Sequence, residues 1–470
     1  MSHHLDEGVP VAAHQKKNLK KVAGPMLLWG IAVGAVISGD YYGWNAGLSF
    51  TGYWGYLVAL GIMGLMYLGL SLVIGELGSA IPHSGGAYAY VRTALGKVWG
   101  YVAGVSVLLE FVFSPVAVAL TVGAYVKVLA PDVPVLLSAG LCYILSIALH
   151  LGGAAGSMKV EFVVTAIAVL GLVLFAIVGM PNVTLENLNA FSAGAIFPNG
   201  IPGLWAALPL AAWFFFAIES LPMTAEETRN PAKDMPRALI WSWITLAIVG
   251  VTTLTVAAGV GGEDLPSAAA PITVALQNVV GQQTWIVPVI ALFSLVALLA
   301  SFHAILLGYS RQVFALSRAG YLPSWLSSLN SRKVPTWGLI VPAIVGFLFC
   351  VIGDQWLADA IPVLVTLSVL VAAVSYMLMM ISAIVLRRRR PDMHRPYRVP
   401  GGESLMWVSL VIAFILIPAS LVGYPIAFVI GAVVMGLFLI YYYAVASKRV
   451  GNLTAEDELA LVEAAEAELE

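Results

Sequence analysis

Long apolar stretches follow one another along almost the whole chain, separated by short groups of polar residues, glycines and prolines. A stretch of 18 or more apolar residues is long enough to cross a bilayer as an α-helix. Counted with boundaries accurate to a few residues, the pattern predicts twelve such spans. They cover residues 25–48, 53–79, 98–129, 134–151, 158–180, 203–227, 237–260, 285–314, 337–353, 357–386, 405–423 and 426–446.

The composition supports a helical membrane protein with many spans. Of the 470 residues, 60% are hydrophobic and 10% are charged, whereas a soluble protein of this length needs roughly a quarter of its residues charged. A β-barrel would require short segments of alternating polarity, which the sequence lacks. Cys142 and Cys350 both lie within apolar stretches, so we expect neither a disulfide nor a metal site.

Lysine and arginine are concentrated in every second gap between spans. The other gaps carry acidic residues, at Asp132, Glu186, Glu263 and Asp264. The positive-inside rule therefore places both termini in the cytoplasm of a multi-pass protein of the cell (inner or plasma) membrane. Residues 1–21 are polar and have no apolar core, so they do not form a signal peptide. The basic residues of the cytoplasmic side are Lys16, Lys17, Lys20, Lys21, Arg92, Lys97, Arg229, Lys233, Arg237, Arg311, Arg318, Arg332, Lys333, Arg387 to Arg390, Arg395, Arg398, Lys448 and Arg449.

Two spans combine an acidic residue with residues that interrupt a helix. In the first span Ser38 and Gly39 precede Asp40. A carboxylate at membrane depth costs about 2.5 to 3.5 kcal/mol, so it needs a partner or a task. In the sixth span Glu219 lies three residues before Pro222, which removes a backbone donor. Because paired interruptions in two halves point to an inverted-repeat transporter, we expect these helices to be broken near residues 38–41 and 216–220.

Three segments near the predicted cytoplasmic ends resemble the signatures of one family. The chain reads GELGSAIPHSGGAYAYVR at 75–92, AEETRNPAKDMPR at 225–237 and SRQVFALSRAGYLP at 310–323. In order and spacing these segments resemble the amino acid, polyamine and organocation (APC) superfamily of permeases, over spans one to ten. The resemblance implies an all-α polytopic membrane fold of twelve helices, with a five-plus-five inverted repeat (LeuT-like) and two extra C-terminal helices.

On this basis we expect five regions. A cytoplasmic segment covers residues 1–24, and a core of ten helices covers 25–386, with repeats at about 25–180 and 203–386. A basic cytoplasmic loop (387–404), two further helices (405–446) and an acidic cytoplasmic tail (447–470) follow.

The first break departs from the usual pattern of the family. Amino acid permeases of this family usually have Gly-Ser-Gly there, and the bare backbone amides bind the substrate carboxylate. Here the same place reads Ser38-Gly39-Asp40, and a fixed carboxylate repels a second one and attracts an ammonium group. The segment ISGDYYGWN at 37–45 resembles that of the ethanolamine permeases, a branch whose substrate is an amine without a carboxylate.

The resemblance also implies the residues of a substrate site. Glu110 lies where the third span of the family lines that site, and Glu219 matches an acid that is common in the family, which implies gating or proton coupling. Trp213 matches a gating aromatic of related cation antiporters, and its ring face can hold an ammonium group. The alternative for the acids is an ion pair with a neighbouring helix, and for the tryptophan it is packing. We expect the substrate site to contain Ser38, Gly39, Asp40, Tyr41, Glu110, Phe111, Trp213, Phe216, Ala217 and Glu219.

Lys159, near the cytoplasmic start of the fifth span, resembles a lysine of sodium-independent family members, in which its ammonium occupies the place of a sodium ion. The resemblance implies that Lys159 couples transport to protons together with Glu219 and Glu110, because a buried lysine can exchange a proton. The alternative is a lysine that reaches the cytoplasmic interface or pairs with Glu161.

These expectations describe a secondary transporter that takes up a small organic amine, ethanolamine first of all, by proton coupling or by exchange. Within the class, the alternatives are an antiporter for longer cations such as putrescine or agmatine, and an amino acid permease. A membrane enzyme would need a metal cluster or an activated nucleophile, and a sensor would need a soluble output domain. A channel would need a repeated filter motif. The sequence shows none of these features. We expect the amine, protons and the lipid bilayer as partners, a monomer or homodimer, and no cofactor, metal or nucleic acid.

Overall fold

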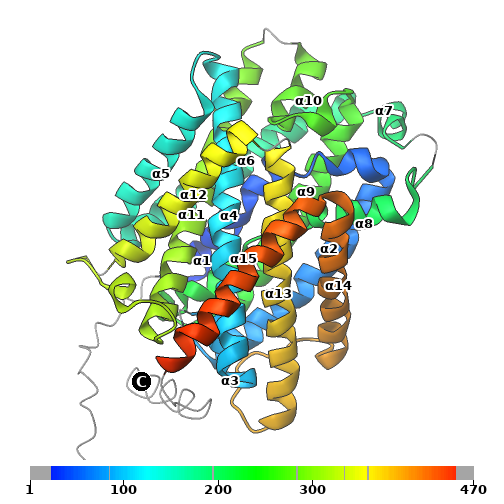
Figure 1. Cartoon of the computed structure of the whole chain (residues 1–470). Helices are drawn as coiled ribbons and strands as arrows, with labels where there is room; N and C mark the ends of the chain where they lie inside the picture. The colour runs from blue at the N-terminus through cyan, green and yellow to red at the C-terminus, as the bar shows by residue number, and fades with distance from the viewer. Residues whose placement is uncertain are drawn as a thin grey trace, which may run out of the picture.

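The computed structural model of the chain describes residues 23–450, apart from residues 84, 193–194, 282–283, 333 and 357–358. Most of the predicted N-terminal segment (1–24) and acidic tail (447–470) lies outside the described residues. The described part is built from helices (Figure 1). The α-helices are α1 (Pro25–Tyr41), α2 (Gly47–Ala80), α3 (Ala87–Leu95), α4 (Lys97–Leu129), α5 (Val135–Leu151), α6 (Ala154–Gly179), α7 (Leu185–Ala190), α8 (Gly200–Ala212), α9 (Pro231–Val260), α10 (Pro271–Val280), α11 (Ile286–Arg318), α12 (Thr336–Trp356), α13 (Ala360–Arg389), α14 (Gly402–Gly423) and α15 (Pro425–Ala444). The 3₁₀ helices are η1 (Met180–Asn182), η2 (Trp213–Phe215), η3 (Ile218–Glu227), η4 (Leu265–Ser267), η5 (Ser324–Ser327) and η6 (Ala446–Lys448).

Ten of the helices in the described part are long and apolar enough to cross a membrane. The apolar helices α1 and α5, with 17 residues each, are slightly shorter. Together these helices match the twelve predicted spans in order, which confirms the all-α polytopic architecture. The shorter helices α7 and α10 lie at one end of the molecule and α3 at the other (Figure 1). The two ends are called the α10 end and the α3 end below.

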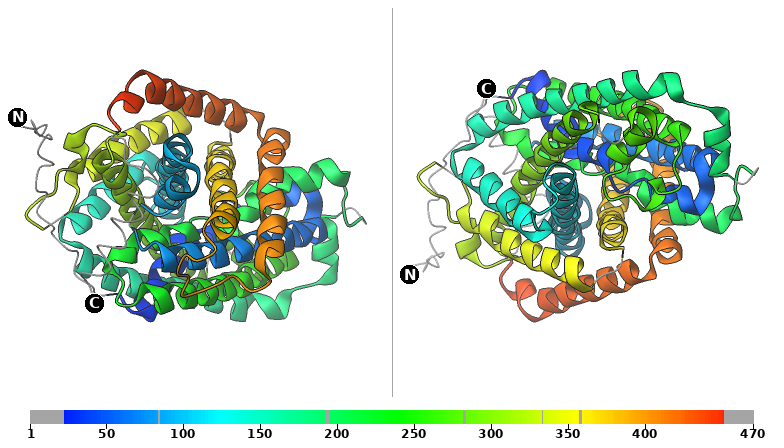
Figure 2. Two further views of the ribbon diagram at one scale, coloured as in Figure 1. Left: turned by 90° about the horizontal axis from the view of Figure 1, so that it is seen from below. Right: turned by 90° about the horizontal axis from the view of Figure 1, so that it is seen from above.

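The helices form a buried centre and an apolar periphery. Every residue in the most apolar window of α4 is buried, and α4 packs against α13, α11 and α5. The last two helices, α14 and α15, lie on the outside (Figure 2), where large apolar side chains such as Phe414 and Leu437 are exposed. Such an apolar surface is favourable against lipid and unfavourable against water. The helices can lie in lipid because their backbone groups are hydrogen-bonded within each helix. The arrangement is that of a multi-pass membrane protein.

The first predicted span is interrupted, but not where the sequence pattern predicts. The helix α1 continues through residues 38–41, and the backbone becomes extended at Tyr42 before Gly43 takes a φ of 85°. The expected break at 38–41 is therefore wrong by a few residues. The indole Nε1 of Trp44 donates to the Asp40 carbonyl at 3.0 Å, and the Tyr125 hydroxyl donates to the Tyr41 carbonyl at 2.8 Å. Because these side chains satisfy the free carbonyls of the helix end, α1 can stop deep in the protein.

The sixth predicted span is broken at the expected place. The helix α8 passes into the 3₁₀ turn η2, Phe216 is extended, and Ala217 has a φ of 75° before η3 begins. A residue other than glycine in this left-handed region is strained, and such strain is held in place by the surrounding structure, often at functional sites. Both η2 and η3 pack against α1, so the two interrupted helices meet in the interior.

Glu76, near the end of α2, binds the loop between α13 and α14. Its carboxylate accepts hydrogen bonds from Arg387 Nε at 2.8 Å and from the Val399 N–H at 2.7 Å, and it lies 3.5 Å from Arg395 Nε. The Glu76 side chain is 2% exposed. This buried ion cluster fixes the basic loop against the α3 end.

A second connection at the same end joins α1 to η3. The Ala23 N–H donates to the Glu227 carbonyl at 3.0 Å, and the Arg229 N–H donates to the Ala23 carbonyl at 2.9 Å. The Glu227 carboxylate also forms a buried ion pair with Arg311 of α11. The start of α1, the end of η3 and α11 are thus connected to one another.

Glu76→Gln is expected to destabilise the protein by about 3 kcal/mol, at the low end for breaking a buried ion pair because Arg387 is partly exposed. The melting temperature in detergent should fall by several degrees. Glu403→Gln is the control, because the Arg388–Glu403 pair is exposed and its loss should change the melting temperature little. Equal melting temperatures for the two variants would contradict a stabilising role for the Glu76 cluster.

Candidate functional site

Asp40 lies in the last turn of α1 without an ionic partner among the described residues. Its side chain is fully buried, and neither carboxyl oxygen has a hydrogen-bond donor in the described part of the protein. The carboxyl group faces α9, where a Cβ atom placed on Gly250 would lie 3.6 Å from Oδ1. An isolated buried carboxylate is costly, so this group is suited to receive a cation or a proton.

Aromatic rings surround the place where the two interrupted helices meet. The Trp213 ring stacks on Phe216 at 4.6 Å between centroids, and Tyr42 meets Trp213 edge-on at 5.6 Å. On the same η2 turn, Phe214 lies 5.7 Å from Trp44. Ring faces attract organic cations, so these side chains can line a site for an ammonium group.

Two glycines allow α1 to approach η2 this closely. A Cβ atom on Gly39 would overlap the Trp213 carbonyl oxygen. A Cβ atom on Gly43 would lie 3.1 Å from Trp213 Nε1 and 3.0 Å from Val365 of α13. The glycine in the predicted Ser-Gly-Asp motif is therefore required by close packing between the two breaks.

A second acidic group lies between other helices. The carboxyl groups of Glu110 in α4 and Glu219 in η3 interact with each other, and the Tyr376 hydroxyl of α13 donates to Glu110 Oε1 at 3.3 Å. The Tyr67 hydroxyl of α2 donates to the Tyr376 hydroxyl, also at 3.3 Å. Glu110 and Glu219 are at most 3% exposed. Two adjacent buried carboxyl groups cannot both ionise cheaply, so such a pair is suited to hold one proton.

The acids that the sequence places in one site have different neighbours in the structure. Asp40 faces α9, whereas Glu110 and Glu219 face Tyr376. Trp213, Phe216 and Ala217 do lie at the meeting point with α1.

Other expected site residues have structural contacts. The Tyr41 hydroxyl donates to the Ala168 carbonyl of α6 at 2.7 Å, so this ring is held against α6. Phe111 packs on α11, where a Cβ atom on Gly308 would lie 2.9 Å from its ring. The Ser38 N–H donates to the Ser301 hydroxyl at 3.0 Å. Ser38 thus connects the break region to α11.

Lys159 does not have the position that the resemblance implies. Its side chain is exposed, and Glu161, two residues later in α6, is 2% exposed instead. The expected burial of Lys159 is therefore wrong. Residues two apart on a helix point in nearly opposite directions, so Glu161 is buried where Lys159 is exposed. The role of Lys159 in coupling stays a prediction.

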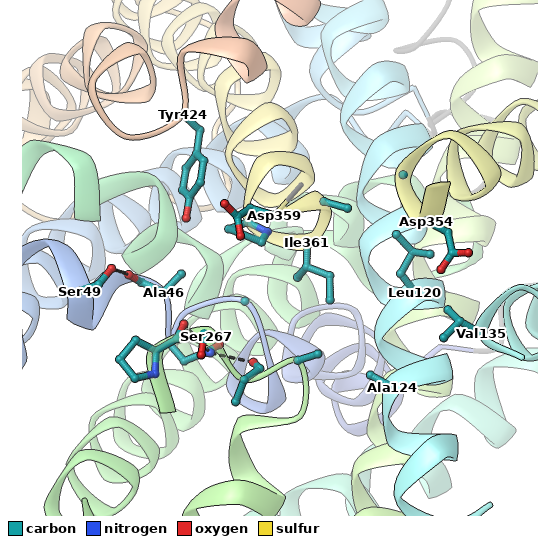
Figure 3. Close-up of a pocket in the computed structure, with 18 residues that line it drawn as sticks. Ala46, Ser49, Leu120, Ala124, Val135, Ser267, Asp354, Asp359, Ile361 and Tyr424 are labelled. Atoms are coloured by element: carbon teal, nitrogen blue, oxygen red, sulfur yellow. Dashed lines mark hydrogen bonds between the residues drawn. The ribbon is translucent and has the colours of Figure 1, made fainter. Parts of the chain in front are cut away.

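A pocket of ≈ 550 Å³ opens at the α10 end, above the break of α1 (Figure 3). Asp359 and Tyr424 lie on one side of it, and Asp354 lies on the other, near Leu120. Burial, and after it the Asp359 carboxylate, raises the pKa of Tyr424 to about 12. Gly43, which lies close to Trp213, is among the residues that line the pocket, so the pocket lies next to the meeting point of the two interrupted helices.

Sequence reasoning missed several polar residues of this region. Tyr376 is the hydrogen-bond donor to Glu110, and its only sequence signal is a tyrosine within a long apolar stretch. Asn45 Nδ2 lies 2.8 to 3.1 Å from three carbonyl oxygens of residues 265–268, which fixes the η4 loop above α1. These contacts connect residues more than 200 positions apart, so local pattern cannot reveal them.

Comparisons with known proteins agree with the architecture. The sequence profile of the family described as "Amino acid permease" matches residues 26–447. The branched-chain amino acid permease of Bacillus subtilis is 25% identical over 462 residues, covering 91% of this chain and 95% of that protein. An uncharacterized transporter of Mycobacterium tuberculosis is 32% identical over 330 residues, covering 68% of this chain and 71% of that protein. The D-serine/D-alanine/glycine transporter of Escherichia coli is 23% identical over 425 residues, with 86% and 88% covered.

Gly39→Ala is expected to lower transport by at least about tenfold, because its methyl group would push α1 away from the Trp213 backbone and misplace the site. Uptake of labelled substrate into proteoliposomes measures the loss. Gly61→Ala is the matched control: a Cβ atom there has no atom within 4 Å, so activity should stay and α2 should become slightly more stable. Normal uptake by Gly39→Ala would show that this contact does not shape the site.

Proposed function

The chain belongs to the amino acid permease family, and on that premise we propose that it takes up a small organic amine without a carboxylate, ethanolamine first of all. The protein is a transporter and not an enzyme. The identity of the substrate is inferred from the chemistry of the residues at the break of α1.

The observation that carries the proposal is the unpartnered carboxyl group of Asp40. It is fully buried beside the break, where a substrate carboxylate would meet a fixed negative charge. An ammonium group would neutralise Asp40, whereas a zwitterionic amino acid also brings a carboxylate, which needs a donor of its own beside the Asp40 charge. The charge of the site thus favours an amine over an amino acid.

The aromatic residues favour a small substrate. Trp213, Phe216 and Tyr42 pack against one another at the end of α1, so a ligand that enters between these rings must be small. Long polyamines, which need a longer cavity, fit this arrangement poorly. A hydroxyl group on the substrate can bond to backbone groups that the two breaks free.

The Glu110–Glu219 pair supports coupling to a proton. The pair faces Tyr376 rather than Asp40, so the amine and the proton have separate carboxyl groups. We assign the coupled proton to this pair and the amine to Asp40. When the amine neutralises Asp40 and the proton neutralises the Glu110–Glu219 pair, the amine and the proton can cross the closed interior together at a lower energetic cost.

The charge distribution supports the direction of uptake. The loop with Arg387 and Arg395 lies at the α3 end, which the positive-inside rule assigns to the cytoplasm together with both termini. The pocket with Asp354 and Asp359 then faces outward, where acidic side chains attract a cation. We propose a multi-pass protein of the plasma membrane.

The second candidate is an amino acid permease. It is favoured by the names of the relatives from Bacillus subtilis and Escherichia coli, which transport amino acids. In that case a protonated Asp40 would donate to the substrate carboxylate instead of neutralising an ammonium group. A comparison of ethanolamine with alanine therefore separates the two candidates.

Asp40→Asn is expected to weaken ethanolamine binding by at least about 100-fold, because the amide keeps the shape and removes the charge. Binding is measured as the rise in melting temperature with ethanolamine, choline, methylamine, putrescine, alanine and arginine. Asp132→Asn, an acid in an exposed loop, is the control and should bind as the wild type does. Normal ethanolamine binding by Asp40→Asn, or tighter wild-type binding of alanine than of ethanolamine, would refute the charge argument.

Uptake is expected to rise with an inward proton gradient and to be unchanged when sodium is replaced by potassium. Glu110→Gln keeps the bond from Tyr376 and removes one acid of the pair, so it should abolish the response to the proton gradient while exchange persists. Proteoliposomes loaded at different internal pH measure both activities. A sodium requirement, or a full proton response in Glu110→Gln, would exclude this coupling.

A further inference from the structure

The connection between α11 and α12 places two large aromatic side chains on the surface. Trp325 of η5 is 51% exposed, and Trp337, the second residue of α12, is 48% exposed. Their rings meet edge-on, with 5.9 Å between the centroids. Because α12 is long and apolar enough to cross a membrane from Thr336 on, Trp337 lies at the boundary of the span and Trp325 lies beside it. Tryptophan is enriched at this depth, where an apolar ring can face the acyl chains and its N–H can face the headgroups.

The connection is held in place on its inner side. The Ser317 hydroxyl donates to the Pro323 carbonyl at 2.7 Å, and η5 packs against both α11 and α12. A Cβ atom on Gly338 would lie 3.2 Å from the carbonyl oxygens of both Leu326 and Ser310, so α12 begins close to the other two elements. A surface whose backbone is already ordered binds a ligand without first losing conformational entropy.

A tight turn between the two tryptophans in the sequence presents a basic side chain. Leu329 and Pro335 form an antiparallel backbone bridge, so the chain leaves and returns at the same place. At the turn, Asn330 Oδ1 accepts hydrogen bonds from the N–H groups of Arg332 at 2.9 Å and of Val334 at 3.0 Å. These bonds fix the backbone of Arg332, whose side chain is exposed. Arg332 therefore stays close to the start of α12.

The guanidinium group of Arg332 has donors to spare. Its Nη1 donates to the carbonyl of Leu151, the last residue of α5, at 3.4 Å. This bond uses one of the five N–H donors of a guanidinium group, and the others can bind phosphate oxygens, often two at a time. Arg332 can therefore hold a phosphate group and α5 together.

The charge of the connection favours an anion. Residues 319–353 contain no aspartate or glutamate, and the bond of Arg332 to α5 goes to a neutral carbonyl. By contrast, Arg388, an exposed arginine near the same end of the molecule, lies 2.6 Å from the Glu403 carboxylate. That ion pair neutralises Arg388, so of these two arginines Arg332 attracts an anion more strongly.

We propose that the surface formed by Trp325, Leu329, Arg332 and Trp337 binds an anionic phospholipid. Arg332 bonds to the lipid phosphate, while the two rings and Leu329, which is 41% exposed, pack against the glycerol and the upper part of the acyl chains. The bound lipid connects the end of α5 to the start of α12, because Arg332 reaches both. A zwitterionic lipid offers the same apolar part, but its own positive group weakens the attraction to Arg332.

Lipid binding to the full-length protein in detergent tests the proposal. No transported compound is needed, so the result is independent of the proposed function. The protein is titrated with phosphatidylglycerol or phosphatidylcholine that carry the same two short acyl chains. Native mass spectrometry counts the bound lipid, and the rise in melting temperature gives a second measure of binding. The wild type should bind phosphatidylglycerol at least about tenfold more tightly than phosphatidylcholine.

Three variants separate the charge from the apolar contacts. Arg332→Gln should weaken phosphatidylglycerol binding about fivefold and leave phosphatidylcholine binding unchanged, because it removes one positive charge. The double variant Trp325→Ala/Trp337→Ala should weaken the binding of both lipids by a similar factor, because the rings contact the part that the two lipids share. Arg388→Gln is the matched control and should bind both lipids as the wild type does, since Glu403 already neutralises Arg388.

Four outcomes would overturn the proposal. Equal wild-type affinities for the two lipids, or unchanged phosphatidylglycerol binding in Arg332→Gln, would remove the role of the charge. An equal loss in Arg388→Gln would show that any basic residue at this end has the same effect. Stabilisation by glycerol 3-phosphate as large as that by phosphatidylglycerol would identify a soluble phosphate as the ligand instead of a lipid. If the double tryptophan variant does not fold, the comparison of Arg332→Gln with Arg388→Gln decides.

Discussion

Burying carboxyl groups without donors is the constraint around which this protein is arranged. Asp40, Glu161 and Glu219 each have two oxygens without a hydrogen-bond donor among the described residues. In a low-dielectric interior such a group is tolerated only while it holds a proton or a cation. The packing of the helices around each acid therefore depends on whether that acid holds a proton or a cation.

The three acidic places have different neighbours. Asp40 lies beside Gly250 of α9, and Glu110 accepts a hydrogen bond from Tyr376 and interacts with Glu219. Glu161 lies beside Thr165 of its own helix, whose hydroxyl donates to the Gly30 carbonyl. In the proposed function, Asp40 receives the amine and the Glu110–Glu219 pair holds the proton. A transporter that moves a charged amine needs such separate places, because one acid cannot bind substrate and proton at once.

The sequence predicts the spans, and it shows which spans contain an acid, because both are local signals. Runs of apolar residues give the helices, and an acid within such a run is conspicuous wherever it lies. It does not predict which way a side chain points. Lys159 and Glu161 differ by two positions, and contact with Gly34 decides that the acid is the buried one. The end of α1 is likewise set by Trp44 and Tyr125, one of which comes from a distant helix.

The backbone bridge between Ala23 and Thr228 affects how tightly the membrane stays sealed. It joins the start of the first interrupted helix to the end of the second, across the two halves of the chain. If these two segments moved separately, one could open a path at the α3 end while the pocket at the α10 end was still open. Because backbone hydrogen bonds join them, we expect the two segments to move together, which would suppress a partial opening that leaks ions. The link is made by main-chain groups, so it does not depend on a charge or hydrogen-bonding group of the side chains at these positions.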